Sequence, residues 1–440
     1  MSSTEYDLII VGGGIAGLRT GIEALKINSN MRCCILEKYG YIGGRINTFR
    51  KNIPKIGEVQ WENGAGRISV SHTKILKLLE QYKLNFLPIP DETDYVKDPD
   101  YTGKIPHIVA NNFTNLINVY LGPIEKLPPS VLANHTLKEL LDKTLGPGAA
   151  KHFYIQFPYY SEIHILRADI ALESFKHEMR SNKGFGVCAE GMSSLIDAMT
   201  NEFFFRGGTV IMDTQIKSIK NNKDNSISLE CKIRNTTQNK TYIGKTVVLA
   251  LHHNAIKTIK GVNKIDVLKH LEMTPLLRMY AIFPTRTGVS WFTGLNKIVT
   301  DSPVRYIIPI DSTRGIVMIS YTDGDDATNW IKQDNRHENV KDLVMTEIRK
   351  LFPERTIPDP RFFKQHPWYD GTTYWLPGTY NVEEESNNSL HPLEKKMPNL
   401  FMCGESFAVK QCWMESALEQ ADKLCNNIKF REVIELSSKS

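Results

Sequence analysis

Three glycines near the amino terminus have the spacing that binds a dinucleotide. Gly12, Gly14 and Gly17 form the pattern G-x-G-x-x-G directly after the apolar run Leu8–Val11. The first glycine permits a tight turn, the second lets the backbone approach a diphosphate, and the third lets a helix pack closely on a strand. A diphosphate can then lie at the helix N-terminus, where free N–H groups and the helix dipole favour negative charge.

An acidic residue at the end of the next apolar run extends this prediction. Glu37 follows the run Cys33–Leu36 and lies 20 residues after Gly17. A carboxylate at this distance accepts hydrogen bonds from a ribose 2′-OH, which favours the adenosine of FAD or NAD over that of NADP. The alternative is a glycine-rich turn without a ligand, but the strand, the helix and the acid together favour dinucleotide binding.

The composition is that of an ordinary globular protein, and its net charge is small. The chain has 440 residues, of which 41% are hydrophobic and 23% charged, so it is long enough for two or three lobes with cores of their own. A formal net charge of +5 gives no indication of nucleic acid binding. It mildly favours anionic or zwitterionic ligands over polyamines.

Cysteines, histidines and the chain ends predict a cytoplasmic protein without a metal centre or a membrane anchor. The seven cysteines contain no C-x-x-C pair, which favours reduced structural thiols. His252 and His253 are adjacent at a strand end and would point in opposite directions, so no shared metal is expected. Met1–Glu5 is too short and polar for a signal peptide, and no apolar run reaches the roughly 18 residues of a membrane span.

A G-G-R triplet, Gly43-Gly44-Arg45, follows the predicted ribose-binding acid. Together with the glycine pattern, it resembles the flavin-containing amine oxidases, which carry this triplet at the same place. The resemblance implies FAD as the cofactor, with the planar fork of the arginine contacting the pyrophosphate. The FAD contacts implied in this region are Gly12, Gly14, Ile15, Ala16, Gly17, Glu37, Lys38, Gly44 and Arg45.

A second glycine-rich segment, Trp61–Ile68, predicts a substrate contact at Arg67. The segment precedes an amphipathic helix predicted over about 72–83. It resembles a segment of L-amino-acid oxidases whose arginine holds the substrate carboxylate through two parallel N–H bonds. The alternative is a structural arginine that pairs with an acid or with FAD phosphate. The resemblance also implies FAD contacts from Gly64, Ala65, Gly66 and Arg67.

A helical region is predicted over residues 111–183, with Thr136–Leu145 bounded by a polar cap and by glycines. L-amino-acid oxidases carry a helical insert at this point that lines a substrate entrance. The aromatic cluster of this region, which includes Phe153, Phe157 and Tyr159, is assigned to the core because most such clusters are core.

A second FAD-contacting segment is predicted after this region. A helix over about 191–205 and the strand Thr209–Ile219 resemble the family's segment in which Ile216 would meet the adenine. Three further strands, about Ile227–Ile233, Thr241–Ile243 and Val247–Leu251, are predicted from their patterns.

The strand Leu276–Phe283 places an arginine where the family has a lysine. In the family this strand carries a lysine that is hydrogen-bonded through water to flavin N5, and the matching position here is Arg278. An arginine cannot lose its proton at working pH, so the roles left to this catalytic candidate are water positioning and anion binding.

The segment His366–Gly378 resembles the one that covers one side of the flavin ring in this family. Its W-x-P-G pattern makes Trp375 a predicted substrate contact. Members that bind FAD covalently have a cysteine just upstream of the proline-glycine pair, and 370–374 contains none, so FAD is predicted to bind non-covalently.

The C-terminal segments Asn399–Glu405 and Gln411–Glu419 match the family's last FAD motif. A helix beginning near Trp413 and Met414 would point its dipole at the flavin N1/C2=O edge, where the reduced ring carries negative charge. The resemblance implies FAD contacts from Gly404, Glu405, Trp413 and Met414, and makes Trp413 also a catalytic and substrate-binding residue that forms an aromatic wall for the amine. A tryptophan that only packs is the alternative.

The resemblance implies an α/β fold with a discontinuous Rossmann-type FAD-binding domain, an α+β substrate domain and a helical insert. The FAD-binding domain is predicted to comprise residues 1–70, 186–265 and 397–430. The substrate domain is predicted to comprise residues 71–115 and 266–396, and the insert residues 116–185.

The predicted activity is oxidation of an L-amino acid to its imine and 2-oxo acid, with release of ammonia and H2O2. The implied partners are a small-molecule amine or amino acid and O2, with no nucleic acid, and a homodimer is left open. One alternative is a polyamine or monoamine oxidase or a desaturase-like flavoenzyme, which would not need Arg67 to hold a carboxylate. The other is an FAD-binding protein without oxidase activity.

Overall fold

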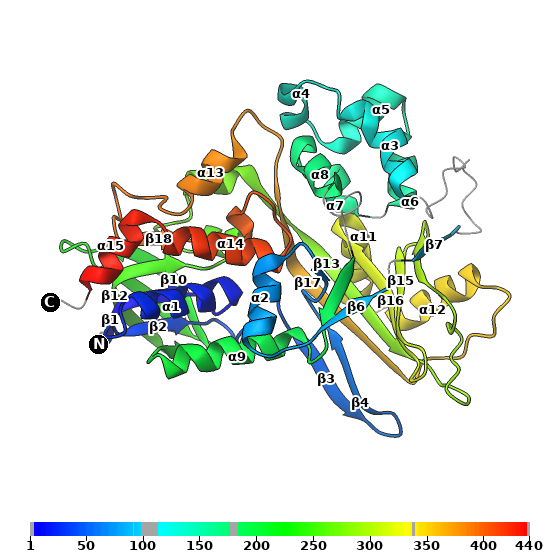
Figure 1. Ribbon diagram of the computed structural model, residues 1–440, viewed down its shortest axis with the longest axis horizontal. Coiled ribbons are helices and arrows are strands. Elements are labelled where there is room, and N and C mark those ends of the chain that lie inside the picture. Colours follow the sequence, from blue (N-terminus) through cyan, green and yellow to red (C-terminus); the bar gives the residue numbers. More distant parts are fainter. Residues whose placement is uncertain are drawn as a thin grey trace.

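The computed structural model describes residues 4–90, 92–97, 113–157, 159–176, 184–336 and 339–437. Two large sheets and a group of helices make up these residues, and both chain ends lie at the lobe that contains strand β1 (Figure 1). Within the described residues, no helix is long and apolar enough to cross a bilayer.

The first lobe is built on a seven-stranded sheet in which the strand order is β10-β11-β12-β1-β2-β9, with β18 paired to β12. Strands β12, β1, β2, β9 and β18 are parallel, as expected for a Rossmann-type domain. The strands are β1 (Thr4–Val11), β2 (Cys33–Leu36), β9 (Thr209–Ile211), β10 (Thr214–Asn221), β11 (Ile227–Ile233), β12 (Asn239–Leu249) and β18 (Leu400–Met402).

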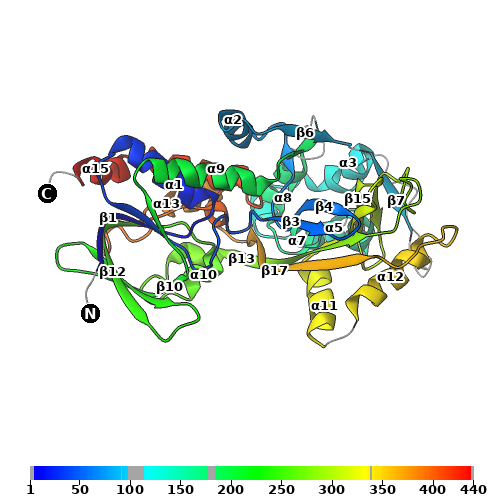
Figure 2. The ribbon, with the colours of Figure 1, turned by 90° about the horizontal axis from the view of Figure 1, so that it is seen from below.

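Both faces of this sheet are buried, because alternate side chains of β1 enter two different cores. Leu8 and Ile10 pack with helices α1 (Ile15–Ile27), α9 (Met192–Phe205) and α14 (Met414–Cys425). Figure 2 shows α1, α9 and α15 (Ile428–Leu436) on one side of the sheet. This arrangement explains why the strands have continuous apolar runs rather than alternating patterns.

Two predicted strand boundaries in this lobe are wrong. The predicted strand Thr209–Ile219 is two strands, β9 and β10, because Asp213 between them has a φ of +53° and breaks the extended backbone. The predicted strands Thr241–Ile243 and Val247–Leu251 are one strand, β12, because its first part pairs with β11 while most of its length pairs with β1.

The second lobe is built on a six-stranded sheet in the order β17-β13-β16-β15-β14-β7. Helices α11 (Gly324–Asn335) and α12 (Val340–Leu351) pack on one face, and the hairpin β3–β4 packs on the other. The strands of the hairpin are β3 (Thr48–Ile53) and β4 (Gly57–Glu62). The strands of the six-stranded sheet are β7 (Thr93–Val96), β13 (Leu271–Ile282), β14 (Lys297–Thr300), β15 (Tyr306–Asp311), β16 (Ile316–Asp323) and β17 (Phe362–Trp375).

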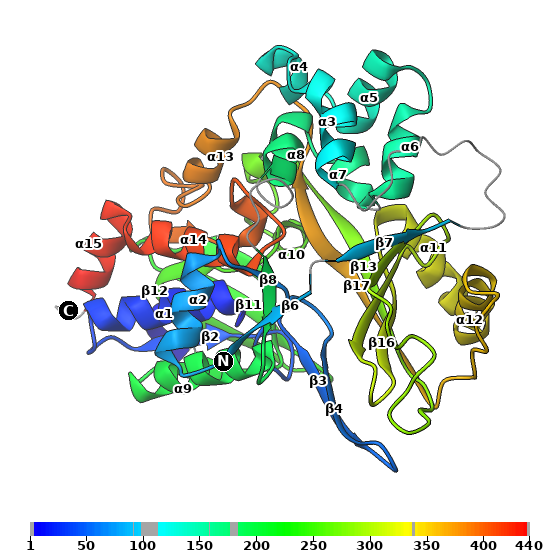
Figure 3. The same cartoon turned by 45° about the vertical axis from the view of Figure 1, so that its right-hand side comes forward.

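The helices predicted in the middle of the chain form a group beside the second sheet, at the top of Figure 3. The predicted helix Thr136–Leu145 is confirmed as α5, in which Thr136 and Glu139 form a capping box. The group consists of α3 (Phe113–Ile124), α4 (Pro129–Ala133), α5 (Leu137–Leu145), α6 (Ala149–Gln156), α7 (Tyr160–His164) and α8 (Ala168–Phe175).

Short elements connect the two lobes. A three-stranded sheet in the order β5-β8-β6 lies next to the amphipathic helix α2, which is confirmed from the sequence with Ile75, Leu78 and Leu79 buried. The remaining elements are β5 (Ile68–Ser69), α2 (Thr73–Gln81), β6 (Phe86–Ile89), β8 (Phe185–Cys188), α10 (His253–Lys257) and α13 (Val382–Asn388). The predicted domain boundaries stay predictions.

Candidate functional site

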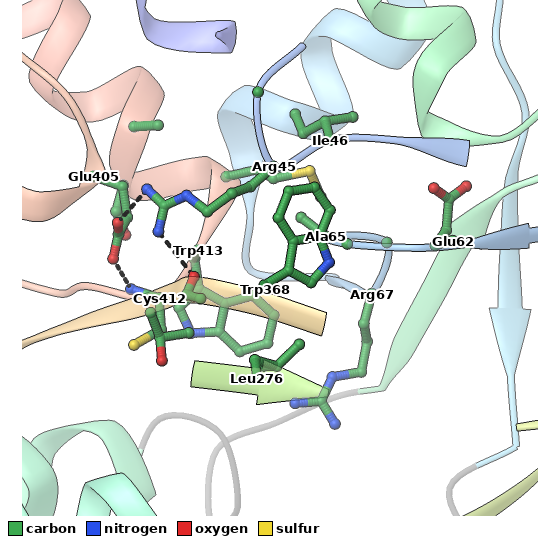
Figure 4. A pocket seen from close by; sticks show the side chains of 18 of the residues that line it. Arg45, Ile46, Glu62, Ala65, Arg67, Leu276, Trp368, Glu405, Cys412 and Trp413 are labelled. Carbon is green, nitrogen blue, oxygen red and sulfur yellow. Dashed lines mark hydrogen bonds and ion pairs between the residues drawn. The ribbon is translucent and has the colours of Figure 1, made fainter. Parts of the chain in front are cut away.

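A cavity of about 1620 Å³ is lined by residues of both large sheets and of the helical group. Small-molecule sites occupy roughly 300–1,000 Å³, so this cavity has room for a large cofactor and a second ligand. Figure 4 shows that several of its side chains come from segments far apart in the sequence.

At one end of the cavity the glycine pattern of the first β–α turn has the shape of a diphosphate cradle. Gly12 has a φ of +106°, and a Cβ atom on Gly17 would lie 2.1 Å from the Gly12 carbonyl oxygen, so neither position accepts a side chain. A Cβ atom on Gly14 would meet no atom within 4 Å, and Gly14 is the N-cap of α1. The open space therefore lies directly at the helix N-terminus, which fits a dinucleotide diphosphate.

Glu37 lies in this part of the cavity with its carboxylate fixed by the backbone. Its two oxygens accept hydrogen bonds from the N–H groups of Gly13 and Tyr39, each at 2.8 Å. Burial raises the pKa of Glu37, and these N–H groups oppose the rise. Lys38 and Ile216 line the same cavity, as the predicted adenosine contacts must.

Arg45 and Glu405 join the two ends of the chain at the cavity. Arg45 Nη2 lies 2.7 Å from Glu405 Oε2, and Arg45 Nη1 donates to the carbonyl oxygen of Gly371 at 3.0 Å. Glu405 Oε1 accepts a hydrogen bond from Cys412 N–H at 2.7 Å (Figure 4). The ion pair therefore fixes the G-G-R triplet against the C-terminal motif, while direct contact of either residue with FAD stays a prediction.

The predicted helix at the C-terminal motif is confirmed as α14, which begins at Met414 with Trp413 as its N-cap. Both residues line the cavity, so the helix N-terminus is directed into it. The Trp413 ring lies 4.7 Å from the His72 ring, and burial and Arg67 lower the pKa of His72 to about 4. His72 is therefore neutral at neutral pH.

The Arg67 side chain extends into the cavity beside aromatic rings (Figure 4). Its Cζ atom lies 4.3 Å from the ring centre of Phe185 and 5.3 Å from that of Trp413. Its Nη1 atom donates a hydrogen bond to the Tyr159 hydroxyl at 3.5 Å. The assignment of the whole aromatic cluster to the core is therefore wrong for Tyr159, which lines the cavity, and right for the buried Phe153.

Arg278 lines the cavity from the middle strand of the second sheet. Its Nη1 atom donates to the main-chain oxygen of Glu62 at 3.1 Å, and its Cζ atom lies 5.3 Å from the ring centre of Tyr321. Burial raises the pKa of the Glu62 carboxyl, which also lines the cavity. These contacts fix Arg278 between the main chain of Glu62 and the ring of Tyr321.

The structure corrects the predicted substrate contact at Trp375. This side chain is fully buried in the first core, donates to the carbonyl oxygen of Ala408 at 2.9 Å and does not line the cavity. Trp368, seven residues earlier on β17, lines the cavity instead. The pairing of β17 with β13 shifts register between Thr372 and Trp368, so the alternation of faces does not carry over from one tryptophan to the other.

Most of the predicted contact residues lie together along this cavity. The exception besides Trp375 is Gly17, which packs the helix against the preceding turn. Residues that sequence reasoning missed are Tyr159, Phe185, Tyr306, Tyr321 and Trp368. Four of them lie outside the motifs used above. Trp368 lies within the segment His366–Gly378, but the W-x-P-G pattern pointed to Trp375 instead.

Comparison with known proteins decides the family. A family model described as flavin containing amine oxidoreductase matches residues 15–429. The chain belongs to this family. Its cofactor is therefore FAD, which the cradle at Gly14 and the carboxylate of Glu37 fit, and the absence of cysteine from 370–374 accords with non-covalent binding.

Individual relatives of this flavin-containing amine oxidoreductase are distant. An L-amino-acid oxidase of the fish Siganus canaliculatus is 21% identical over 97% of this chain and 86% of its own length. Human flavin-containing amine oxidase B is 28% identical over 35% of this chain and 32% of its own length. A solved structure of putrescine oxidase bound to putrescine aligns with a TM-score of 0.71 at 14% identity, over 96% of this chain and 99% of that one, and confirms the fold.

Proposed function

We propose that this flavin-containing amine oxidoreductase is an oxidase of L-amino acids. The observation that carries the proposal is the position of Arg67 in the cavity, where its guanidinium lies against the rings of Phe185 and Trp413. A guanidinium binds a carboxylate through two parallel hydrogen bonds with defined geometry, and the aromatic faces limit its hydration. The similarity to the Siganus L-amino-acid oxidase over nearly the whole chain supports the same substrate class.

Each residue of the site has a part in this reaction. Arg67 binds the α-carboxylate, and Trp413 and Trp368 bound the space in which the amine lies. Arg278 holds a fixed positive charge that can orient water or an anionic group. When bound, FAD would supply the redox chemistry that oxidises the amine to an imine, with the two electrons and two protons passing to O2 to give H2O2. Water then converts the released imine to a 2-oxo acid and ammonia.

A polyamine or monoamine oxidase is the second candidate. The positive charges of Arg67 and Arg278 disfavour a diamine as the substrate. A diammonium ligand would approach two guanidiniums, those of Arg67 and Arg278, and like charges in a cavity of low dielectric cost free energy. The putrescine oxidase similarity concerns the fold and does not carry the substrate over to this chain.

The proposal is tested by H2O2 release from a panel of L-amino acids, polyamines and aryl amines, with the wild-type holoprotein and with Arg67→Ala. We expect turnover of an L-amino acid and a loss of kcat/KM of about 100-fold in the variant, because charge-assisted hydrogen bonds to the carboxylate disappear. Unchanged amino-acid turnover in Arg67→Ala would remove the assignment.

A flavin that no amine reduces under anaerobic conditions would instead favour an FAD-binding protein without oxidase activity. Release of H2O2 in the panel assay shows whether O2 is the electron acceptor. Homodimer formation stays a prediction.

A further inference from the structure

One wall of the cavity carries three phenol rings between two guanidinium groups. The ring centres of Tyr159 and Tyr306 are 5.5 Å apart, and those of Tyr306 and Tyr321 are 5.7 Å apart. Arg67 Nη1 lies 3.5 Å from the Tyr159 hydroxyl at one end, and Arg278 Cζ lies 5.3 Å from the Tyr321 ring centre at the other. All five side chains line the cavity.

The two guanidiniums lie close enough to act on the same phenol. Burial raises the pKa of Tyr321, and the positive charges of Arg278 and Arg67 both oppose the rise. Tyr321 stays neutral at neutral pH, so its O–H group is available to donate a hydrogen bond to an anion.

The carboxyl groups near this wall each accept hydrogen bonds from other groups. Burial raises the pKa values of Glu62 and Asp323, and backbone N–H groups occupy their oxygens. Glu162 also lines the cavity, and its carboxylate accepts a hydrogen bond from the Tyr374 hydroxyl at 3.4 Å. A guanidinium keeps its charge at any working pH, so this part of the cavity carries two fixed positive charges.

The wall offers more anion-binding capacity than one carboxylate needs. The side chain of Arg278 is half-buried, and its Nε atom has no hydrogen-bond partner among the residues that the structure describes. A buried donor without a partner costs free energy, which a ligand that accepts its hydrogen bond would recover. The ammonium group of a lysine at this position would lie nearer to the strand than the guanidinium does. It would also lack the planar fork of N–H donors that a guanidinium offers to a carboxylate.

We propose that the substrate is an L-amino acid with a second carboxylate in its side chain, bound by Arg67 at the α-carboxylate and by Arg278 at the side-chain carboxylate. The inference rests on the proposed function, because it assigns the other end of the same bound amino acid. It makes Arg278 a specificity-determining residue, since its charge attracts an anionic side chain and repels a cationic one.

Binding of carboxylates that lack an amine tests the second guanidinium without any turnover. Glutarate and valerate have the same length and differ by one carboxylate, and their dissociation constants are measured from the change in the absorbance spectrum of bound FAD. We expect glutarate to bind at least about tenfold more tightly than valerate to the wild-type holoprotein. Equal affinities would overturn the proposal.

The variant Arg278→Met should remove the preference for glutarate, so that the ratio of the two dissociation constants falls to about one. Arg431→Met serves as the matched control, because Arg431 lies on α15 and pairs with Glu435 at 3.7 Å, outside the cavity. Retention of the glutarate preference in Arg278→Met would contradict the assignment. If this variant does not retain FAD, the wild-type comparison still decides the question.

Oxidation assays separate a failure of this inference from a failure of the proposed function. The wild-type holoprotein is given L-aspartate, L-glutamate, L-2-aminoadipate, L-glutamine, L-leucine and putrescine. A preference for one of the dicarboxylic amino acids over L-glutamine of about tenfold or more in kcat/KM supports the inference. Turnover of neutral amino acids alone overturns it and leaves the amino-acid oxidase standing, whereas turnover of putrescine alone overturns both.

Discussion

The cofactor end and the substrate end of the cavity are built in different ways. At the cofactor end, backbone atoms and small residues dominate: Gly12, Gly14 and Gly17 shape the turn, and the N–H groups of Gly13 and Tyr39 fix the Glu37 carboxylate. At the substrate end, long side chains dominate. Arg67, Tyr159, Tyr306, Tyr321 and Arg278 meet there from five separate segments of the chain.

This difference predicts different consequences of mutation. A backbone cradle tolerates no added atom where two segments touch, so changes there should affect folding and FAD content together. A wall of side chains can be altered one group at a time, so changes there should affect which ligand binds while the fold remains. The following experiments test that contrast.

The largest effect is expected at Gly17. A Cβ atom in Gly17→Ala would lie 2.1 Å from the Gly12 carbonyl oxygen, so helix and strand must separate. We expect the free energy of unfolding to fall by about 3 kcal/mol or more, with loss of bound FAD. Chemical denaturation and the ratio of flavin to protein absorbance measure both quantities.

Gly14→Ala is the matched comparison, because its Cβ atom would enter open space. The apoprotein should unfold at the same denaturant concentration as wild type, while the dissociation constant for FAD rises by about tenfold, since the methyl group occupies the approach to the diphosphate. Normal FAD affinity in Gly14→Ala would mean that the diphosphate lies elsewhere.

At the substrate end, Arg67→Lys keeps the charge and removes the planar fork. We expect kcat/KM for the amino-acid substrate to fall by about 10- to 100-fold, because an ammonium group cannot form two parallel hydrogen bonds to a carboxylate. FAD content and unfolding should match wild type. Steady-state kinetics decide the matter, and an unchanged KM would show that Arg67 has only a structural role.

The two tryptophans of β17 give a smaller and sharper contrast. Trp375→Phe removes a buried hydrogen bond to Ala408 and some core volume, so we expect a loss of stability of about 1–2 kcal/mol with unchanged KM. Trp368→Phe, at the cavity, should change KM instead. If Trp375→Phe changed KM and Trp368→Phe lowered only the stability, Trp375 would be the substrate contact.

The last prediction concerns pH. Burial, with Arg67 at His72 and Arg45 at His252, lowers the pKa of each imidazole from 6.5 to about 4. Between these values the unfolded chain binds a proton that the folded chain does not, so stability is lost as the pH falls. Each histidine should contribute a slope of about 1.4 kcal/mol per pH unit in this window.

Replacing one histidine at each end separates their contributions to this slope. Between about pH 6.5 and about pH 4, His72→Gln and His252→Gln should each reduce the slope of the free energy of unfolding against pH. The reduction in each variant should equal the contribution of one bound proton. Denaturant titrations across that range provide the measurement, and a slope that is unchanged in both variants would contradict these pKa assignments.

The contrast between the two ends also explains what could be predicted from the sequence. The cofactor end was predictable because glycine spacing, strand and acid are adjacent in the chain and each is required by backbone geometry. The substrate end depends on register and on contacts between distant segments. Trp368 and Trp375 illustrate the limit, since the W-x-P-G pattern marks the segment but not the face of the strand to which each ring points.

Tyr159 illustrates a second limit of sequence analysis. It belongs to an aromatic cluster in which Phe153 is buried in the core, and composition alone does not separate a core ring from one that lines a cavity. The hydrogen bond from Arg67 places Tyr159 at the site, and the two residues are 92 positions apart. Sequence patterns report local structure, so such a pairing could not be predicted.

The most direct test of the account compares amino acids with the amines that lack only the α-carboxylate. The holoprotein is mixed without oxygen with L-glutamate or 4-aminobutyrate, and with L-phenylalanine or 2-phenylethylamine, and bleaching of the flavin absorbance is followed. If Arg67 anchors a carboxylate, at least one amino acid will reduce the flavin while its decarboxylated partner does not. Equal or faster reduction by the amines would contradict the account.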